Sequence, residues 1–261
     1  MLMTNIYHIN LNKQMIKNAK AALIPGDPAR VIKIAKALSD KSYELAFNRE
    51  YRTWIVPINK SDNILVTSTG IGGPSATIAI EELAYLGIKV FVRVGTTGSI
   101  QKNLRVGDIA ITNASVRLDG SSTHYAPIEY PAVSDFNVTR ILAESAESSK
   151  ISYKIGITAS SDTFYPGQER YDSYTGYVVK RFQGTMKEWQ KLNVLNYEME
   201  SSSVLTSCAA MGLKAGCLAG VIVNRASSEK INHDDVVRAE NNTIKIVEKS
   251  LEKLILLAKQ K

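Results

Sequence analysis

Three apolar, strand-like runs in the first hundred residues each end in a glycine-containing turn. The junctions read IPGDP at residues 24–28, STGIGGPS at residues 68–75 and VGTTGS at residues 94–99. In the first two, Pro28 and Pro74 stand where a helix can begin, because proline suits the first helical turn. A repeated strand, turn and helix predicts an α/β fold with a doubly wound sheet.

The rest of the chain continues this alternation. Runs of β-branched and aromatic residues predict strands at residues 21–25, 43–47, 52–58, 63–69, 89–94, 107–116, 153–161 and 214–224. Helical spacing of apolar residues predicts helices at residues 28–38, 74–86, 135–149, 185–192, 201–211 and 241–259. The polar, glycine-free stretch 226–235 is a candidate for a mobile lid. No repeat or linker divides the chain, so we expect one domain over residues 1–261.

The composition narrows the class of protein. With 44% apolar residues, the chain can form a large core. The net charge of +7 is spread along the sequence without aromatic neighbours, so we expect a solvated basic surface and no nucleic-acid partner. Cys208 and Cys217 lack zinc-site spacing and favour a reducing compartment. No apolar run approaches the roughly 20 residues of a membrane span, so we expect a cytoplasmic protein without a membrane partner.

Arg93 lies inside an apolar run and is followed by Gly95, Thr96, Thr97 and Gly98. A buried guanidinium needs an anionic partner, while glycines and threonine hydroxyls let a ligand approach the backbone closely. We interpret this stretch as an anion site at the carboxyl end of a sheet strand. The alternative is that Arg93 pairs with a buried carboxylate and the TTGS run is only a turn.

The turn at residues 26–30 is a second candidate anion site. Gly26 precedes a helix N-terminus, where free N–H groups attract phosphate, and Arg30 follows one turn later. We expect Asp27 to act mainly as the helix cap. The GxG at residues 70–72 lacks the third glycine of a dinucleotide site, and no P-loop motif occurs, so neither cofactor site is supported.

The loop 162–171, DTFYPGQERY, brings together Phe164, Gln168 and Arg170. An aromatic face, an amide and a cation suit a planar heterocycle that bears carbonyl groups. A chance mixture of residues on a surface loop explains this segment equally well.

Glu198 and Glu200 flank Met199 in an apolar context. Alternation at a strand end would point the two carboxylates the same way, and paired carboxylates in a pocket often serve catalysis or sugar binding.

Seven blocks, in order along the chain, resemble the bacterial uridine phosphorylases, a family within the nucleoside phosphorylase superfamily. They are PGDPARV, STGIGGPS, VRVGTTGSIQ, SVRLDGSSTHYAP, SSDTFYPGQERYDSYTG, NYEMES and AGVIVNR. The resemblance implies a single-domain, three-layer α/β fold with a central mixed, partly barrel-like sheet flanked by helices. It also implies a pentosyltransferase that converts uridine and phosphate reversibly to uracil and ribose 1-phosphate in pyrimidine salvage and catabolism.

The same resemblance implies a role for individual residues. The residues implied to bind phosphate are Gly26, Arg30, Arg93 and Thr96, with Arg49 from a neighbouring subunit. The residues implied to bind ribose are Met199 and Glu200, with His8 from the neighbour. The residues implied to bind uracil are Phe164, Gln168, Arg170, Ile222, Val223 and Arg225, with Tyr7 against the nucleoside. Catalysis is implied for Arg93, Thr96, Glu200, Arg170 and Gln168.

The resemblance further implies a homohexamer built as a trimer of dimers. Phosphate is a co-substrate, and no organic cofactor or catalytic metal is required. Glu50, Ile71 and Ser75 match a monovalent cation site, for K⁺, at the subunit interface.

Two departures from the family pattern stand out. Tyr7 replaces the usual phenylalanine, and whether its hydroxyl alters selectivity is open. The lid at residues 226–233 also diverges, which leaves closure and turnover open.

Three other functions remain to be weighed. A purine nucleoside phosphorylase would share the phosphate site, but similar purine enzymes carry a Ser-Asp pair where this chain has Asn224 and Arg225. A nucleosidase, which uses water, would have little use for Arg30, Arg49 and Arg93 together. A nucleoside-binding relative without catalysis would not need the full polar set.

Overall fold

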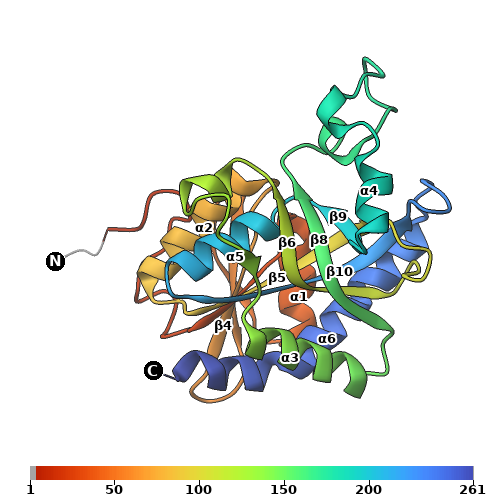
Figure 1. Cartoon of the computed structure of the whole chain (residues 1–261). Helices are drawn as coiled ribbons and strands as arrows, with labels where there is room; N and C mark the ends of the chain where they lie inside the picture. The colour runs from red at the N-terminus through yellow and green to blue at the C-terminus, as the bar shows by residue number, and fades with distance from the viewer. Residues whose placement is uncertain (1–3, 261) are drawn as a thin grey trace.

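Strand β5 (Val90–Ser99) lies at the centre of the molecule and pairs with three other strands. The structure is a computed structural model and describes residues 4–260. Helices cover both faces of the sheet, as Figure 1 shows.

The sheet is mixed. Its strands are β1 Ala21–Ile24, β2 Tyr43–Asn48, β3 Tyr51–Pro57, β4 Asn63–Thr67, β5, β6 Ile109–Leu118, β7 Ala132–Val133, β8 Tyr153–Ser161, β9 Asn196–Glu198 and β10 Lys214–Asn224. From β5 the sheet continues through β1, β4, β3 and β2, and β1 runs parallel to both β4 and β5.

The other half of the sheet closes on itself. Strand β5 pairs with β10, followed by β6, β8 and β9, and β9 pairs again with β5. This ring of five strands confirms the α/β fold with a mixed, partly barrel-like sheet. The doubly wound sheet predicted from the turns alone does not describe this half, because β9, a short strand parallel to β8 and antiparallel to β5, closes the ring. The sequence pattern did not separate β9 from its surroundings.

The helices form two outer layers. They are α1 Pro28–Leu38, α2 Gly73–Leu86, α3 Phe136–Ser148, α4 Thr185–Lys191, α5 Ser201–Ala210 and α6 His233–Lys259, with short 3₁₀ turns η1 Ser121–His124, η2 Pro166–Gln168 and η3 Lys180–Phe182. Helices α1, α3 and α6 pack over one hydrophobic core, and α2 and α5 pack over a second.

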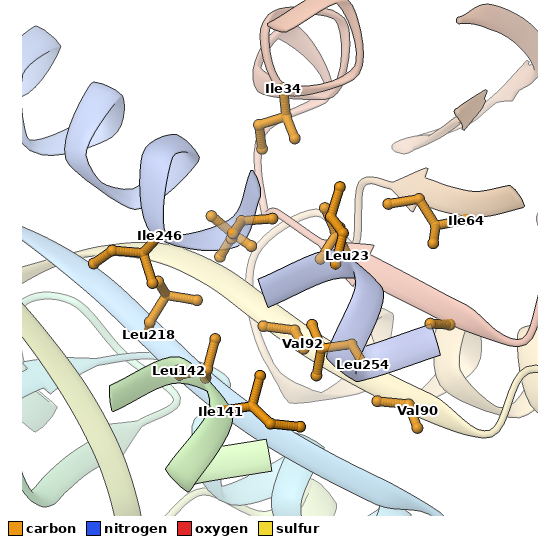
Figure 2. Close-up of a cluster of buried hydrophobic side chains, with 14 of the residues drawn as sticks. Leu23, Ile34, Ile64, Val90, Val92, Ile141, Leu142, Leu218, Ile246 and Leu254 are labelled. Carbon is orange, nitrogen blue, oxygen red and sulfur yellow. The ribbon is translucent and has the colours of Figure 1, made fainter. Parts of the chain in front are cut away.

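The two cores follow from alternation along β5. Val90 and Val92 point into the core beneath α3 and α6, where they meet Leu218 and Leu254 (Figure 2). Phe91 points to the opposite face, into the core beneath α2 and α5. Burial of each such side chain stabilises the fold by about 1.5–3 kcal/mol relative to exposure.

Most predicted elements are confirmed. The Asp27 carboxylate accepts a hydrogen bond from the Ala29 amide at 2.8 Å and caps α1. Asp135 caps α3 in the same way, through the Val138 amide at 3.0 Å. Gly87 ends α2 with φ of 114°, a conformation that favours glycine.

Two predicted boundaries differ most from the structure. The strand predicted at 89–94 continues through Thr96, Thr97 and Gly98 to Ser99, so the TTGS run is not a turn. It stays extended because β10 pairs with β5 along its length. The last helix begins at His233 rather than at residue 241, with Asn232 as its cap, so α6 includes the end of the predicted lid.

Other expectations concern the whole chain. The predicted domain limits, residues 1 and 261, lie outside the described residues. None of the helices within residues 4–260 combines the length and apolar content that crossing a bilayer requires. Cys208 and Cys217 are buried and not joined in a disulfide.

Candidate active site

A cavity of about 400 Å³ lies at the carboxyl ends of the parallel strands β1, β5 and β10. This is the edge where open α/β sheets bind ligands, and the volume suits a small molecule. The predicted site residues that line it are Gly26, Arg30, Ile71, Arg93, Thr96, Phe164, Gln168, Arg170, Met199, Glu200, Ile222 and Val223. Segments far apart in the sequence therefore form one site.

Arg93 is buried and held by both glutamates of the predicted pair. Its Nε donates to Glu198 at 2.8 Å, and its Nη2 contacts the Glu200 carboxylate. Burial opposes the charge, but Glu200 and Glu198 outweigh it and hold the pKa of Arg93 above its usual value. The carboxylate pairing considered for Arg93 is therefore present. Its Nη1 has no hydrogen-bond partner among the described residues, so one donor remains for a ligand.

The two glutamates have different surroundings. Glu198 accepts hydrogen bonds from the amides of Glu200 and Ser201, each at 2.9 Å, and from the Ser201 hydroxyl at 2.6 Å. Burial opposes its ionisation, yet Arg93 and these hydrogen bonds hold the pKa of Glu198 below its usual value. Glu200 accepts one bond from the Gly72 amide at 2.7 Å, and burial raises its pKa. Glu198 is thus the fixed structural partner of Arg93, and Glu200 has the freer carboxylate.

The N-terminus of α1 adds a second cation to this end of the cavity. Burial lowers the pKa of Arg30, and the positive charge of nearby Arg93 lowers it further. At Gly26 a Cβ would lie 3.2 Å from the Gly70 carbonyl oxygen and 3.7 Å from Arg30 Nη2, so glycine keeps this turn close to Arg30. Two guanidiniums that repel each other beside free backbone amides favour an anion between them.

Thr96 and Thr97 take different roles on β5. The Thr97 hydroxyl donates to the Tyr197 carbonyl oxygen at 2.6 Å and is therefore occupied. Thr96 lines the cavity and is only partly buried, so its hydroxyl is available to a ligand.

The opposite end of the cavity carries the loop residues. The Arg170 guanidinium lies 4.3 Å from the centre of the Phe164 ring, within the range of a cation–π contact. Gln168 is 3% exposed and makes no side-chain hydrogen bond with another described residue. A buried amide without a partner calls for a ligand that both donates and accepts.

Glu229 bridges two arginines at this end. It contacts Arg170 Nη1 and Arg225 Nε, each at 2.6 Å. Burial opposes its charge, but the hydrogen bonds from Arg225 and Arg170 hold the pKa of Glu229 below its usual value. The segment between β10 and α6 is therefore tied to the cavity, and its Ile231 lines the wall.

Comparisons with known proteins fit this geometry. A family model described as the phosphorylase superfamily matches residues 20–255. The chain belongs to the phosphorylase superfamily. Proteins named uridine phosphorylase from Salmonella typhimurium and Escherichia coli are each 52% identical to it over 252 residues, which covers 97% of this chain and 99% of theirs. A uridine phosphorylase from Haemophilus influenzae is 51% identical over 245 residues, 94% of this chain and 96% of its own.

In this member of the superfamily, three predicted site residues lie together outside the cavity. The Tyr7 and His8 rings meet edge to face with centroids 4.8 Å apart. Arg49 Nη2 donates to the Tyr7 hydroxyl at 3.4 Å, and its guanidinium lies 5.7 Å from the ring centre. None of the three lines the cavity of its own chain. Tyr7, His8 and Arg49 therefore form a separate cluster on the surface of their own chain.

The predicted cation ligands also come together, around Gly70. A Cβ on Gly70 would lie 2.8 Å from Glu50 Cγ and 3.1 Å from Ser75 Oγ. The Ser75 hydroxyl donates to the Ile71 carbonyl oxygen at 3.3 Å. A carboxylate, a hydroxyl and a carbonyl are oxygen ligands that suit a hard cation.

Some residues of the site were missed from the sequence. Arg225 does not line the cavity but reaches it through Glu229, which was not predicted. The available signal for Glu229 was that it lies four residues after Arg225 and carries the opposite charge. Tyr197 also lines the cavity, and no pattern in the sequence distinguished it from a core residue, whereas Thr97 and Gly98 belong to the stretch that was interpreted as an anion site.

Proposed function

We propose that this protein catalyses the reversible phosphorolysis of uridine to uracil and ribose 1-phosphate. The observation that carries the proposal is a single cavity with an arginine-rich anion site at one end and an unpartnered buried amide, Gln168, at the other. The 52% identity to proteins named uridine phosphorylase, over nearly the whole length of both chains, supports the same reaction.

Phosphate binds at the end of the cavity formed by β5 and α1. Gly26 and Arg30 supply a backbone amide and a cation, while Arg93 and Thr96 supply a guanidinium and a hydroxyl. Arg49 of a neighbouring subunit completes the site. Arginines suit this task because their planar donors match phosphate oxygens.

The ribose lies between the two ends, on Met199 and Glu200. Glu200 accepts hydrogen bonds from the sugar hydroxyls, since its carboxylate has fewer internal partners than that of Glu198. His8 of the neighbouring subunit reaches the 5′-hydroxyl.

Uracil binds at the loop end. Phe164 stacks on the ring, and Gln168 and Arg170 bond its carbonyl and N–H groups. Ile222 and Val223 form the apolar wall, Arg225 supports Arg170 through Glu229, and Tyr7 of the neighbour closes the pocket.

The charges of the site match the reaction. As the bond between C1′ and N1 breaks, its electron pair goes to the base, the ribose becomes positive and uracil becomes negative. Glu200 lies beside the ribose, where positive charge develops, while Arg170 lies beside the uracil, where negative charge develops. A phosphate oxygen then forms the new bond to C1′. Fixed charges placed where charge develops are the main source of catalysis here.

The site is shared between subunits, so the active form is a homo-oligomer, which we infer to be a hexamer built as a trimer of dimers. A K⁺ ion bound by Glu50, Ile71 and Ser75 stabilises the interface, and no organic cofactor is needed. We place the protein in the cytoplasm, where its two buried thiols stay reduced. The chain acts as one domain over its full length.

The test is conversion of uridine to uracil by the purified protein with and without phosphate, with inosine in parallel. The proposal predicts uracil release that requires phosphate and leaves inosine intact. Release without phosphate would mean a nucleosidase, and preference for inosine would mean a purine enzyme. Binding of uridine without release of uracil under either condition would mean a binding protein.

A further inference from the structure

One carboxylate on α2 holds the N-terminal segment in place. Glu82 accepts hydrogen bonds from the His8 amide at 3.1 Å, the Ile9 amide at 2.8 Å and the His8 ring Nδ1 at 2.6 Å. The Glu82 side chain is 15% exposed, so these bonds form largely away from water. Three donors therefore converge on the Glu82 carboxylate. Two of them belong to His8, so Glu82 holds both the backbone and the ring of this residue.

His8 is also restrained on its other sides. Its carbonyl oxygen accepts a bond from Asn48 Nδ2 at 2.8 Å. Its ring lies edge to face with Tyr7 and, at 6.4 Å between centroids, with Tyr51. The imidazole is therefore held in one orientation while its side chain remains 31% exposed.

The bond to Glu82 decides which ring nitrogen carries a proton. A carboxylate only accepts, so Nδ1 must be the donor. In the neutral ring Nε2 then has the lone pair, and it has no hydrogen-bond partner among residues 4–260. A histidine oriented in this way presents an acceptor to whatever faces its exposed edge.

We propose that Glu82 is a positioning residue that fixes the tautomer and direction of His8, so that Nε2 accepts a hydrogen bond from the 5′-hydroxyl of a nucleoside in the neighbouring subunit. This inference rests on the proposed function. It assigns to α2, an element outside the cavity, a part in selecting ribosides that carry a 5′-hydroxyl.

A purely structural role for Glu82 makes a different prediction. If the carboxylate only ties the N-terminal segment to α2, its removal lowers kcat/KM for all substrates alike. If the carboxylate positions His8, its removal lowers kcat/KM only for substrates with a 5′-hydroxyl. Comparison of uridine with 5′-deoxyuridine separates the two roles.

The test variant is Glu82→Gln. The glutamine oxygen can still accept from the two backbone amides, which turns its NH₂ group toward Nδ1 and reverses the tautomer. We expect kcat/KM for uridine to fall about tenfold, because a charge-assisted bond is replaced by a weaker one. For 5′-deoxyuridine we expect a change within about twofold. Glu81→Gln, the same change at the exposed neighbouring position, should leave both substrates unaffected.

A double-mutant cycle checks that the effect passes through His8. His8→Ala should lower kcat/KM for uridine, and Glu82→Gln added to it should cause no further loss. In the wild-type protein, nitrogen NMR of labelled histidine should show the neutral His8 ring protonated on Nδ1, a measurement that needs no variant.

Several results would overturn the inference. These are equal losses on uridine and 5′-deoxyuridine, no loss on either, or a neutral His8 ring protonated on Nε2. If His8→Ala left uridine turnover unchanged in a phosphate-dependent enzyme, the inference would fail while the proposed function stood. Absence of phosphate-dependent turnover in the wild-type protein would instead remove the proposed function.

Discussion

The two ends of the cavity hold their arginines in different ways. Arg93 projects from the middle of β5 and is gripped by Glu198 and Glu200, both at most 6% exposed. Arg170 follows η2 on a loop, and its carboxylate partner is Glu229, whose side chain is 47% exposed. Arg93 is therefore fixed on a paired strand of the sheet, whereas Arg170 is held by an ion pair between two loops.

This difference separates chemistry from selectivity. The end of the cavity formed by β5 and α1, here called the strand end, cannot move without disturbing the sheet. It therefore suits phosphate, which is the co-substrate for every nucleoside. The loop end can change its residues without loss of the core, which suits recognition of the base. We therefore expect substitutions at the strand end to abolish turnover and those at the loop end to alter substrate preference.

The largest effect is expected for Arg93→Ala. Loss of a charged donor at the phosphate should lower phosphate-dependent turnover about a thousandfold. It also leaves two buried carboxylates without their cation, which should lower the free energy of unfolding by about 3–5 kcal/mol. Steady-state kinetics and urea unfolding measure the two losses.

A second variant keeps this prediction independent of folding. Arg93→Ala combined with Glu198→Gln should recover part of the stability and none of the activity, whereas Arg105→Ala, at an exposed arginine, should change neither. Turnover of Arg93→Ala within about tenfold of wild type would remove Arg93 from the anion site.

Gln168→Ala should have the next largest effect. Loss of the amide leaves the carbonyl and N–H groups of uracil unpaired in a buried pocket, so kcat/KM for uridine should fall about a hundredfold. The KM for phosphate should stay within about twofold of wild type, because the substitution lies at the other end of the cavity. An equal rise in both KM values would contradict the division into two ends.

Glu229→Gln should raise the KM for uridine about tenfold at neutral pH, since Arg170 loses the charged partner that orients it. The pKa of Glu229 is held below the usual value for a glutamate. Its effect on uridine binding is therefore fully present at a pH above that usual value, and it is lost as the pH falls through the lowered pKa. Wild type and variant should therefore converge in acid. Glu252→Gln, an exposed glutamate on α6, serves as the control. If the difference in KM for uridine between wild type and Glu229→Gln grew in acid, the proposed role of Glu229 in orienting Arg170 would be wrong.

Tyr7→Phe should have the smallest effect. It removes the hydroxyl that accepts from Arg49 at 3.4 Å, a long bond between exposed groups. We expect the KM for phosphate to rise about twofold to threefold, because an exposed hydrogen bond contributes little. A change in the KM for uridine alone would instead assign the hydroxyl to the base.

The sequence predicted residues at both ends of the cavity, Arg93 and Thr96 at one end and Gln168 and Arg170 at the other. Asp27 was predicted to cap α1 and does so, and Gly87 and Asp135 mark the end of α2 and the start of α3 by the same kind of local chemistry. The extension of β5 through Thr96 could not be predicted, because it depends on pairing with β10, more than a hundred residues away.

The contacts missed from the sequence are also long-range. Glu82 lies in the middle of a helix with nothing to mark it, and its partner His8 is 74 residues away. Glu229 was hidden in a polar stretch interpreted as a lid, since only the fold brings Arg170 to it. Local patterns predict caps and turns, whereas partners of charged groups depend on the tertiary structure.

The most direct test of this account is a crystal structure with uracil and phosphate bound together. The account predicts phosphate within hydrogen-bond distance of Arg30, Arg93 and Thr96, and uracil on Gln168 and Arg170 beside Phe164. Phosphate bound between Arg170 and Arg225, with uracil at the carboxyl end of β5, would contradict it.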